Sequence, residues 1–228
     1  MQKPSVVIVV PILNEEQELD CAIKRLQAVG ADELVFVDGG SVDASTRILE
    51  QNKVIWYSGK SGRAKQMNLG ALKTKSEIVL FLHIDTVISS SNLQKVRVSM
   101  QDDKAVAGRF DVSLSGSHSA FRMVEFFINW RSRLSKISSG DQAMFIRRKV
   151  FESLDGFPDQ VLMEDIELSK RLKHLGEITC LHEKVLTSSR RWEKHGILRT
   201  ILLMWRLRFR YWLGADPARL KQQDVDHG

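Results

Sequence analysis

Short apolar runs alternate with helix-forming segments through the first half of the chain, and this alternation constrains the fold more than any other feature. Continuous apolar runs of this length predict strands that are buried on both faces. The predicted strands are 5–10 ("SVVIVV"), 33–38 ("ELVFVD"), 53–58 ("KVIWYS") and 77–85 ("EIVLFLHID"). Helices are predicted between them at 14–29, 43–51 and 63–74. The pattern predicts an α/β protein with a mostly parallel central sheet flanked by helices.

Polar side chains are predicted to cap the first two helices. Asn14 precedes Glu15 and Glu16, and a carboxylate in the first turn of a helix interacts favourably with the helix dipole. Ser41 or Asp43 is predicted to cap the second helix.

The second half has a less regular pattern. Predicted strands cover 105–114 and 141–148, and 177–189 is predicted to form one or two more. Predicted helices cover 120–136 and 163–176, and an apolar segment with embedded arginines follows at 196–214. No linker divides the sequence, so we expect one domain over residues 1–228.

The composition excludes several classes of protein. The chain has 228 residues and a net charge of +6, which favours anionic partners without choosing among them. Cys21 and Cys180 are far apart, which argues against a disulfide framework or a structural zinc site and fits a reducing compartment. No segment is long and apolar enough to predict a transmembrane helix, and no nucleic-acid-binding signature is present.

Three of the predicted strands end in polar residues. The first leads into 11–15, the second ends at Asp38, and the fourth ends at His83 and Asp85. Ligands of parallel α/β sheets bind beyond the carboxyl ends of the strands, so these side chains are expected to meet in one crevice. In an extended strand, His83 and Asp85 would point to the same side. They could then form a metal site, or simply a solvated strand end.

Four segments in order, "VVPILNEE" (9–16), "VDGGSVD" (37–43), "LHID" (82–85) and "MEDIELSKRL" (163–172), resemble the family 2 glycosyltransferases of GT-A fold. Two further segments, "GRAKQMNLGA" (62–71) and "SGDQAMFIRR" (139–148), resemble a short bacterial, non-processive subgroup. The resemblance covers nearly the whole chain. It implies a nucleotide-sugar-binding half at 1–100, an acceptor and catalytic half at 101–195, and a C-terminal amphipathic helical segment at 196–228.

The resemblance also implies a donor site. Asp85 matches the last position of the family's DxD-like motif, which binds a divalent cation, Mn²⁺ or Mg²⁺, on the donor diphosphate. His83 stands where the first aspartate of that motif is common, so it is expected to contact the nucleotide or to orient a metal-bound water. The family often has two adjacent aspartates where this chain has Asp38 and then Gly39, so only Asp38 is assigned to the nucleotide. The remaining candidates for donor binding are Pro11, Asn14, Glu15 and Arg63.

On the acceptor side, the resemblance implies an inverting enzyme in which Asp165 is the general base and Glu164 supports it. Asp141 and Gln142 are candidates for the acceptor side, as are Arg191 and Trp192, which match part of a QxxRW motif. Ser188 replaces the glutamine of that motif, which argues against a processive synthase. Trp192 could stack on a sugar or pack in the core. The alternatives to a glycosyltransferase are a sugar nucleotidyltransferase and a non-catalytic basic protein that binds nucleotide or lipid.

The segment 196–214 has two interpretations. Arg199, Arg206 and Arg210 fall on one stripe of a helix whose remaining surface is mostly apolar. That pattern suits peripheral contact with an anionic membrane, and equally a helix buried against the sheet or in a homo-oligomer. The expected partners are a nucleotide-sugar donor and an unknown acceptor, for which a lipid or membrane-associated molecule is one alternative; nucleic acid is not expected. The expected location is the cytoplasm, with the inner face of the membrane as an alternative.

Overall fold

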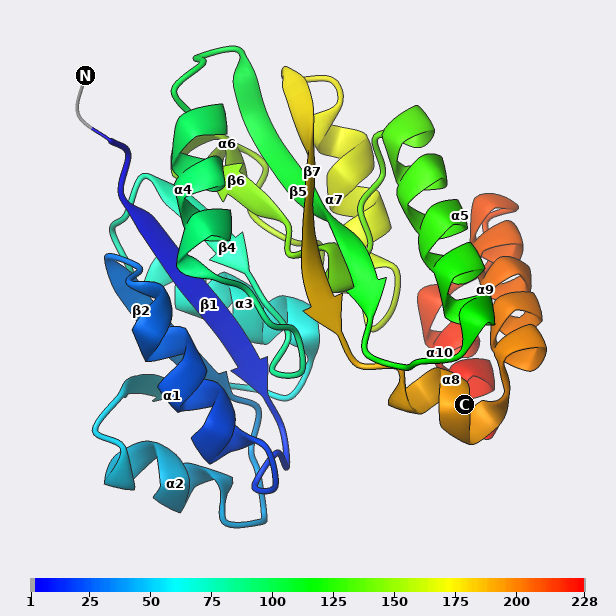
Figure 1. The fold of residues 1–228 in the computed structure, drawn as a ribbon, viewed down its shortest axis with the longest axis horizontal. Coiled ribbons are helices and arrows are strands. Elements are labelled where there is room, and N and C mark those ends of the chain that lie inside the picture. Colours follow the sequence, from blue (N-terminus) through cyan, green and yellow to red (C-terminus); the bar gives the residue numbers. More distant parts are fainter. Residues whose placement is uncertain (1–2, 228) are drawn as a thin grey trace.

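A single seven-stranded sheet runs through the computed structural model, which describes residues 3–227 except for the side chains of Arg191 and of residues 223–227 (Figure 1). The strands are β1 (Val6–Ile12), β2 (Glu33–Asp38), β3 (Ile55–Ser58), β4 (Ile78–Phe81), β5 (Ala105–Leu114), β6 (Phe145–Arg147) and β7 (Glu177–Thr187). Their order across the sheet is β3-β2-β1-β4-β6-β5-β7. Both halves of the sequence therefore contribute to the same sheet.

The sheet is parallel except at β6. Strand β1 pairs in parallel with β2 and β4, β2 with β3, and β5 with β7. Strand β6 lies antiparallel between β4 and β5 and connects the two halves. The predicted mostly parallel α/β sheet is thus confirmed.

Helices cover both faces of the sheet, and β1 shows why its sequence is apolar throughout. Val6, Ile8 and Val10 pack into the core on one face, whereas Val7 and Val9 pack into the core on the other. The first core contains residues of α1 (Leu19–Val29), α2 (Ser45–Gln51) and α4 (Ser90–Ser99). The second contains residues of α3 (Arg63–Leu72), α6 (Arg148–Ser153) and α7 (Glu164–Leu172).

The remaining helices lie at the right of Figure 1. They are α5 (Ser119–Ser135), α8 (Arg190–His195), α9 (Ile197–Trp212) and α10 (Pro217–His227). Helix α5 packs against β5. A 3₁₀ turn at Gly140–Gln142 precedes β6. Among residues 3–227, no helix is long and apolar enough to cross a bilayer.

Two predicted boundaries are wrong for physical reasons. Asn14 does not cap α1, which begins at Leu19: its backbone is left-handed, with φ 56°, and its Oδ1 accepts a hydrogen bond from the amide of Val42. Strand β4 ends at Phe81 rather than at Asp85, because the carbonyl of His83 accepts the amide of Thr86 in a turn.

Candidate functional site

A cavity of about 620 Å³ opens at the carboxyl ends of β1 and β4. Its walls also include the start of α3, the start of α7, and residues of α8 and α10. The lining residues are Pro11, Ile12, Leu13, Glu15, Ser61, Gly62, Arg63, Gln66, His83, Ile84, Asp85, Val161, Leu162, Glu164, Arg190 and Lys221. This is the edge at which a parallel α/β sheet binds ligands.

Six of the predicted site residues border this cavity. They are Pro11, Glu15, Arg63, His83, Asp85 and Glu164. They come from segments that are far apart in the sequence, so the fold assembles them rather than any local motif. A buried residue that the sequence did not single out, Gln66, also belongs here: its Nε2 donates to the carbonyls of Ile12 and Val37 at 2.8 Å each. Gln66 thereby connects the ends of β1 and β2.

Asn14 and Asp38 are absent from the cavity lining and shape its neighbouring loops instead. The buried Asp38 carboxylate accepts hydrogen bonds from the amides of Gly40 and Ser41 and from the Ser41 hydroxyl. In turn, the Ser41 hydroxyl accepts the amide of Asn14 at 2.9 Å. These bonds hold the loops after β1 and β2 together, and direct contact of Asp38 with a nucleotide stays a prediction.

His83 lies against the backbone of the 3₁₀ turn. A Cβ on Gly140 would lie 2.7 Å from Cε1 and Nε2 of the His83 ring, so only glycine leaves room for the imidazole. Nδ1 of His83 lies 3.6 Å from the carboxylate of Asp141. Burial, with a further contribution from Arg63, holds the pKa of His83 well below its ordinary value. The imidazole is therefore neutral at physiological pH and keeps a lone pair for a ligand.

Burial and the negative charges of neighbouring carboxylates raise the pKa of both Asp85 and Glu15. Burial raises the pKa of Asp85, and Glu18 raises it further, while Arg190 opposes them. Burial also raises the pKa of Glu15, followed by the charges of Asp85 and Glu18. Crowded carboxylates whose ionised forms are disfavoured gain from a nearby cation. The position of Asp85 thus fits a divalent ion.

The described residues alone do not complete a coordination shell. Among the described residues, no group of three or more His, Cys, Asp or Glu side chains could hold a metal ion. Asp85 and the neutral His83 are the two potential ligands that the "LHID" segment brings to the cavity. Mg²⁺ and Mn²⁺ are commonly held by one or two protein groups together with phosphate oxygens and water, so the residues fit such an ion on a bound diphosphate.

Glu164 faces the same cavity from the start of α7. Nη1 of Arg63 lies 4.0 Å from Oε1 of Glu164, whose side chain is 8% exposed. Burial raises the pKa of Glu164, the adjacent charge of Asp165 raises it further, and Arg63 opposes both. Desolvation also raises the pKa of Asp141, although its side chain is 48% exposed; Arg63 opposes this shift, and the charges of Asp85 and Asp165 add to it.

Asp165 is anchored by two backbone amides. Its Oδ2 accepts from the amide of Gly140 and its Oδ1 from the amide of Ile166, each at 2.7 Å. It borders a small space of about 10 Å³ next to the main cavity, shared with Arg63, His83 and Glu164. The residue before α7, Met163, has φ 65°, so the helix starts abruptly at the acidic pair.

Two arginines that the sequence did not assign, one on α5 and one on α9, lie near Asp165. Burial lowers the pKa of Arg208, on α9, and the charges of Asp165 and Asp141 oppose that shift. Burial lowers the pKa of Arg131, on α5, to about 10, with Arg208 as the next cause. Nε and Nη2 of Arg131 are buried without a hydrogen-bond partner among the described residues. The hydrophobic periodicity of α5 and α9 did not indicate that Arg131 and Arg208 point inward.

The remaining acceptor-side candidates lie elsewhere. Gln142 is completely buried, and its Oε1 accepts the amide of Ser139 at 3.0 Å, so it supports the 3₁₀ turn. Trp192 is 8% exposed and packs with Leu114 and Phe121, and its contact with a sugar stays a prediction. The side chain of Arg191 lies outside the described residues. The neighbouring Arg190 borders the cavity and pairs with Glu18 at 2.6 Å.

The sheet, with a cavity at the carboxyl ends of β1 and β4, defines an α/β domain of GT-A fold, and comparison with known proteins agrees. Residues 7–155 match the family described as Glycosyl transferase family 2. The chain belongs to this family.

Two curated relatives match along nearly all of this chain. A probable glycosyltransferase of Bacillus subtilis (strain 168), YdaM, is 25% identical over 96% of this chain and 57% of its own length. A beta-monoglucosyldiacylglycerol synthase of Nostoc sp. (strain PCC 7120 / SAG 25.82 / UTEX 2576) is 24% identical over 97% of this chain and 51% of its own length. The chain thus spans little more than half the length of these relatives.

Solved structures share the fold at low identity. The mannosyltransferase PcManGT from Pyrobaculum calidifontis, in complex with GDP-Man and Mn²⁺, superposes with a TM-score of 0.63 at 19% identity over 81% of this chain and 57% of its own. Glucosyl-3-phosphoglycerate synthase from Mycobacterium tuberculosis was solved in complex with Mn²⁺, UDP and glucosyl-3-phosphoglycerate. It superposes with a TM-score of 0.61 at 16% identity, over 79% of this chain and 70% of its own. The GT-A fold predicted from the sequence is confirmed.

Proposed function

We propose that this protein transfers a sugar from a nucleoside diphosphate donor to an acceptor hydroxyl, with inversion at the anomeric carbon. One arrangement carries the proposal: Asp85, Arg63 and Glu164 border a single cavity, and Asp165 lies beside it. Asp85, which can hold a cation, thus lies close to the two carboxylates of Glu164 and Asp165. The family membership of the chain and the nucleotide complexes of its structural neighbours support this assignment over a nucleotidyltransferase or a non-catalytic protein.

On the donor side, the proposed ligands of the diphosphate are cationic. Arg63, Arg190 and Lys221 all border the cavity. Asp85, with the neutral His83 nearby, would hold Mn²⁺ or Mg²⁺. When bound, such an ion supplies positive charge to the diphosphate as it leaves.

On the acceptor side, the proposed base is Asp165. Its carboxylate takes the proton of the acceptor hydroxyl while the oxygen bonds to the anomeric carbon, and the bond from that carbon to the diphosphate oxygen breaks. The amides of Gly140 and Ile166 hold the carboxylate in place, and Arg208 provides a positive charge in its surroundings. Glu164, with its raised pKa, supports the acceptor by hydrogen bonding.

Calorimetric titration with UDP and with GDP tests the donor site. We expect tighter binding of at least one nucleotide with Mn²⁺ than with EDTA, and Asp85→Asn should remove that difference. Asp103→Asn, at a fully exposed carboxylate outside the cavity lining, serves as the matched control and should bind as the unmodified protein does. Equal affinities in Mn²⁺ and EDTA for both nucleotides would contradict the proposed role of Asp85.

A further inference from the structure

Helix α5 buries Phe121 and Val124 near its start, but along the rest of its length it buries polar residues and exposes large apolar ones. Its buried positions include Glu125, Asn129 and Ser132. Five large apolar side chains of the same helix are each more than half exposed: Met123, Phe126, Phe127, Trp130 and Leu134. A surface helix of a globular protein normally has the opposite arrangement.

The buried polar residues fix the orientation of α5. Asn129 pairs with β5 through both ends of its amide: Oδ1 accepts the amide of Val112 at 2.9 Å, and Nδ2 donates to the carbonyl of Val112 at 3.1 Å. Oε1 of Glu125 accepts the amide of Leu114 at 2.6 Å. Rotating the helix to bury its aromatic residues would break all of these bonds, and unpaired buried polar groups are costly.

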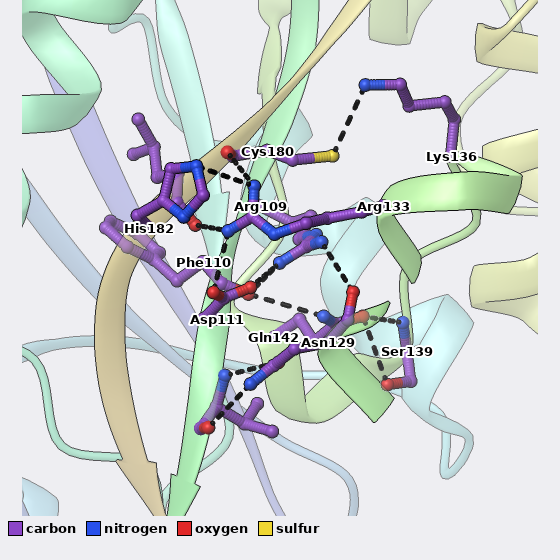
Figure 2. Close-up of polar contacts among 12 residues, drawn as sticks. Arg109, Phe110, Asp111, Asn129, Arg133, Lys136, Ser139, Gln142, Cys180 and His182 are labelled. Atoms are coloured by element: carbon purple, nitrogen blue, oxygen red, sulfur yellow. Dashed lines mark hydrogen bonds and ion pairs between the residues drawn. The ribbon is translucent and has the colours of Figure 1, made fainter. Parts of the chain in front are cut away.

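An ion-pair network strengthens the same attachment (Figure 2). Asp111 on β5 accepts from the completely buried Arg109 and, at 2.7 Å, from Arg133 on α5. Nη1 and Nη2 of Arg133 also donate to the carbonyls of Cys180 and Leu181 on β7, at 3.0 and 3.2 Å. The exposed apolar face of α5 is therefore held rigidly on the outside of the molecule.

Helix α9 adds a second exposed apolar row. Five of its large apolar residues, at spacings of three and four, are more than half exposed: Leu198, Leu202, Trp205, Phe209 and Trp212. The two helices lie side by side in Figure 1, and Ile128 of α5 packs into the same cluster as Ile201 and Met204 of α9. We call the two exposed rows, five residues on each helix, the α5–α9 apolar surface. Exposed apolar patches of this kind mark sites of interaction.

The charges on α5 and α9 favour an anionic bilayer over a second copy of the chain as the partner of this surface. α5 and α9 carry seven arginines and one carboxylate, Glu125, which is buried and pairs with Arg122 and Lys184. A second copy of the chain docked face to face would bring the exposed Arg122, Arg199 and Arg206 of both copies close together. An anionic bilayer offers apolar tails to the aromatic residues and phosphates to the arginines.

We propose that the α5–α9 apolar surface docks the protein on an anionic lipid bilayer. The tryptophans and phenylalanines enter the boundary between headgroups and acyl chains, where such side chains are favoured. The exposed Arg199 and Arg206 contact headgroup phosphates. The two helices would lie on the surface of the bilayer, and none of the described helices is long and apolar enough to span one. This inference is independent of the donor site, so either proposal can fail without the other.

Sedimentation with lipid vesicles tests the proposal. The protein should bind vesicles that contain phosphatidylglycerol at low salt, bind pure phosphatidylcholine vesicles more weakly, and dissociate at high salt because surface attraction is screened. Trp205→Ser and Phe209→Ser should each lower the partition coefficient about tenfold, in keeping with the apolar area removed. Arg206→Glu should weaken binding to anionic vesicles only. Leu72→Ser changes an equally exposed apolar residue on α3 and should have no effect.

The variants are expected to fold, because the altered side chains are exposed, and unchanged thermal unfolding checks this. Vesicle binding with a blue shift of tryptophan fluorescence supports the proposal. Absence of binding to anionic vesicles overturns it. So does reversible dimerisation that Trp205→Ser abolishes in a protein that ignores vesicles, because a second copy would then cover the surface.

Discussion

The amide of Gly140 donates a 2.7 Å hydrogen bond to Oδ2 of Asp165. Gly140 also lies so close to His83 that a side chain at this position would meet the imidazole. One small residue thus connects the proposed base with the histidine of the "LHID" segment. The turn before β6 fixes the position of both groups, although Gly140 itself contributes no reactive side chain.

Gly140→Ala should disturb both His83 and Asp165, because Gly140 contacts both residues. A Cβ at 2.7 Å from two ring atoms of His83 must displace the ring, and overpacking of this kind costs about 1–3 kcal/mol. We expect a lower free energy of unfolding, measured by urea denaturation, and weaker nucleotide binding. Combining Gly140→Ala with His83→Ala should restore much of the stability, since the opposing ring is gone. A double variant as unstable as Gly140→Ala would place the conflict elsewhere.

Asp165→Asn should remove the base and leave donor binding intact. The asparagine keeps the size of the side chain but cannot take a proton, so the transfer rate should fall roughly 10²–10⁴-fold. Turnover is measured with an identified donor and acceptor, and donor affinity by calorimetry. Asp103→Asn again serves as the control, because its carboxylate is fully exposed. Near-normal turnover in Asp165→Asn would refute the assignment, and lost donor binding would move Asp165 to the donor site.

Glu164→Gln should stabilise the protein at neutral pH. Burial and Asp165 raise the pKa of Glu164 in the folded state, so the ionised carboxylate reduces stability at pH values above that raised pKa. The cost disappears as the pH falls towards the ordinary pKa of glutamate, about 4.3. We therefore expect a gain of about 0.5–2 kcal/mol near pH 7.5 that shrinks on acidification.

Thermal and urea unfolding of Glu164→Gln across this pH range provide the measurement. Glu50→Gln, an exposed glutamate on α2, is the control and should change stability by less than about 0.5 kcal/mol. A Glu164→Gln protein that is less stable at pH 7.5 would show that the contact with Arg63 outweighs the cost of burial.

Arg109→Met should destabilise the protein strongly. The substitution leaves the buried carboxylate of Asp111 with Arg133 as its remaining ion-pair partner, and breaking a buried pair costs about 3 kcal/mol or more. Lys184→Met removes a mostly exposed cation from Glu125 and should cost at most about 1 kcal/mol. Chemical denaturation compares the two variants. Equal effects would mean that the network in Figure 2 contributes little to stability.

The sequence determined the sheet and most of the proposed donor edge. Uniform apolar runs such as Val6–Ile12 can only be buried on both faces, and the intervening helical segments require parallel strands. Because the carboxyl ends of parallel strands meet at one edge, the strand pattern alone assigns Glu15 and Asp85 to one crevice, and both border the cavity.

Only the tertiary structure decided which side chains reach the cavity and which helix faces are buried, because both depend on contacts between residues that are distant in the sequence. Asp38 ends its strand as predicted, yet its carboxylate is taken up by the turn at Gly40 and Ser41. Arg190, which the sequence did not assign, also borders the cavity, and Arg208 lies near Asp165 whereas Arg206 of the same helix is exposed. The apolar residues of α5 look like a core in sequence. Only the bonds of Asn129 and Glu125 to β5 show that they lie outside, since periodicity reveals that a helix has two faces and not which of them packs.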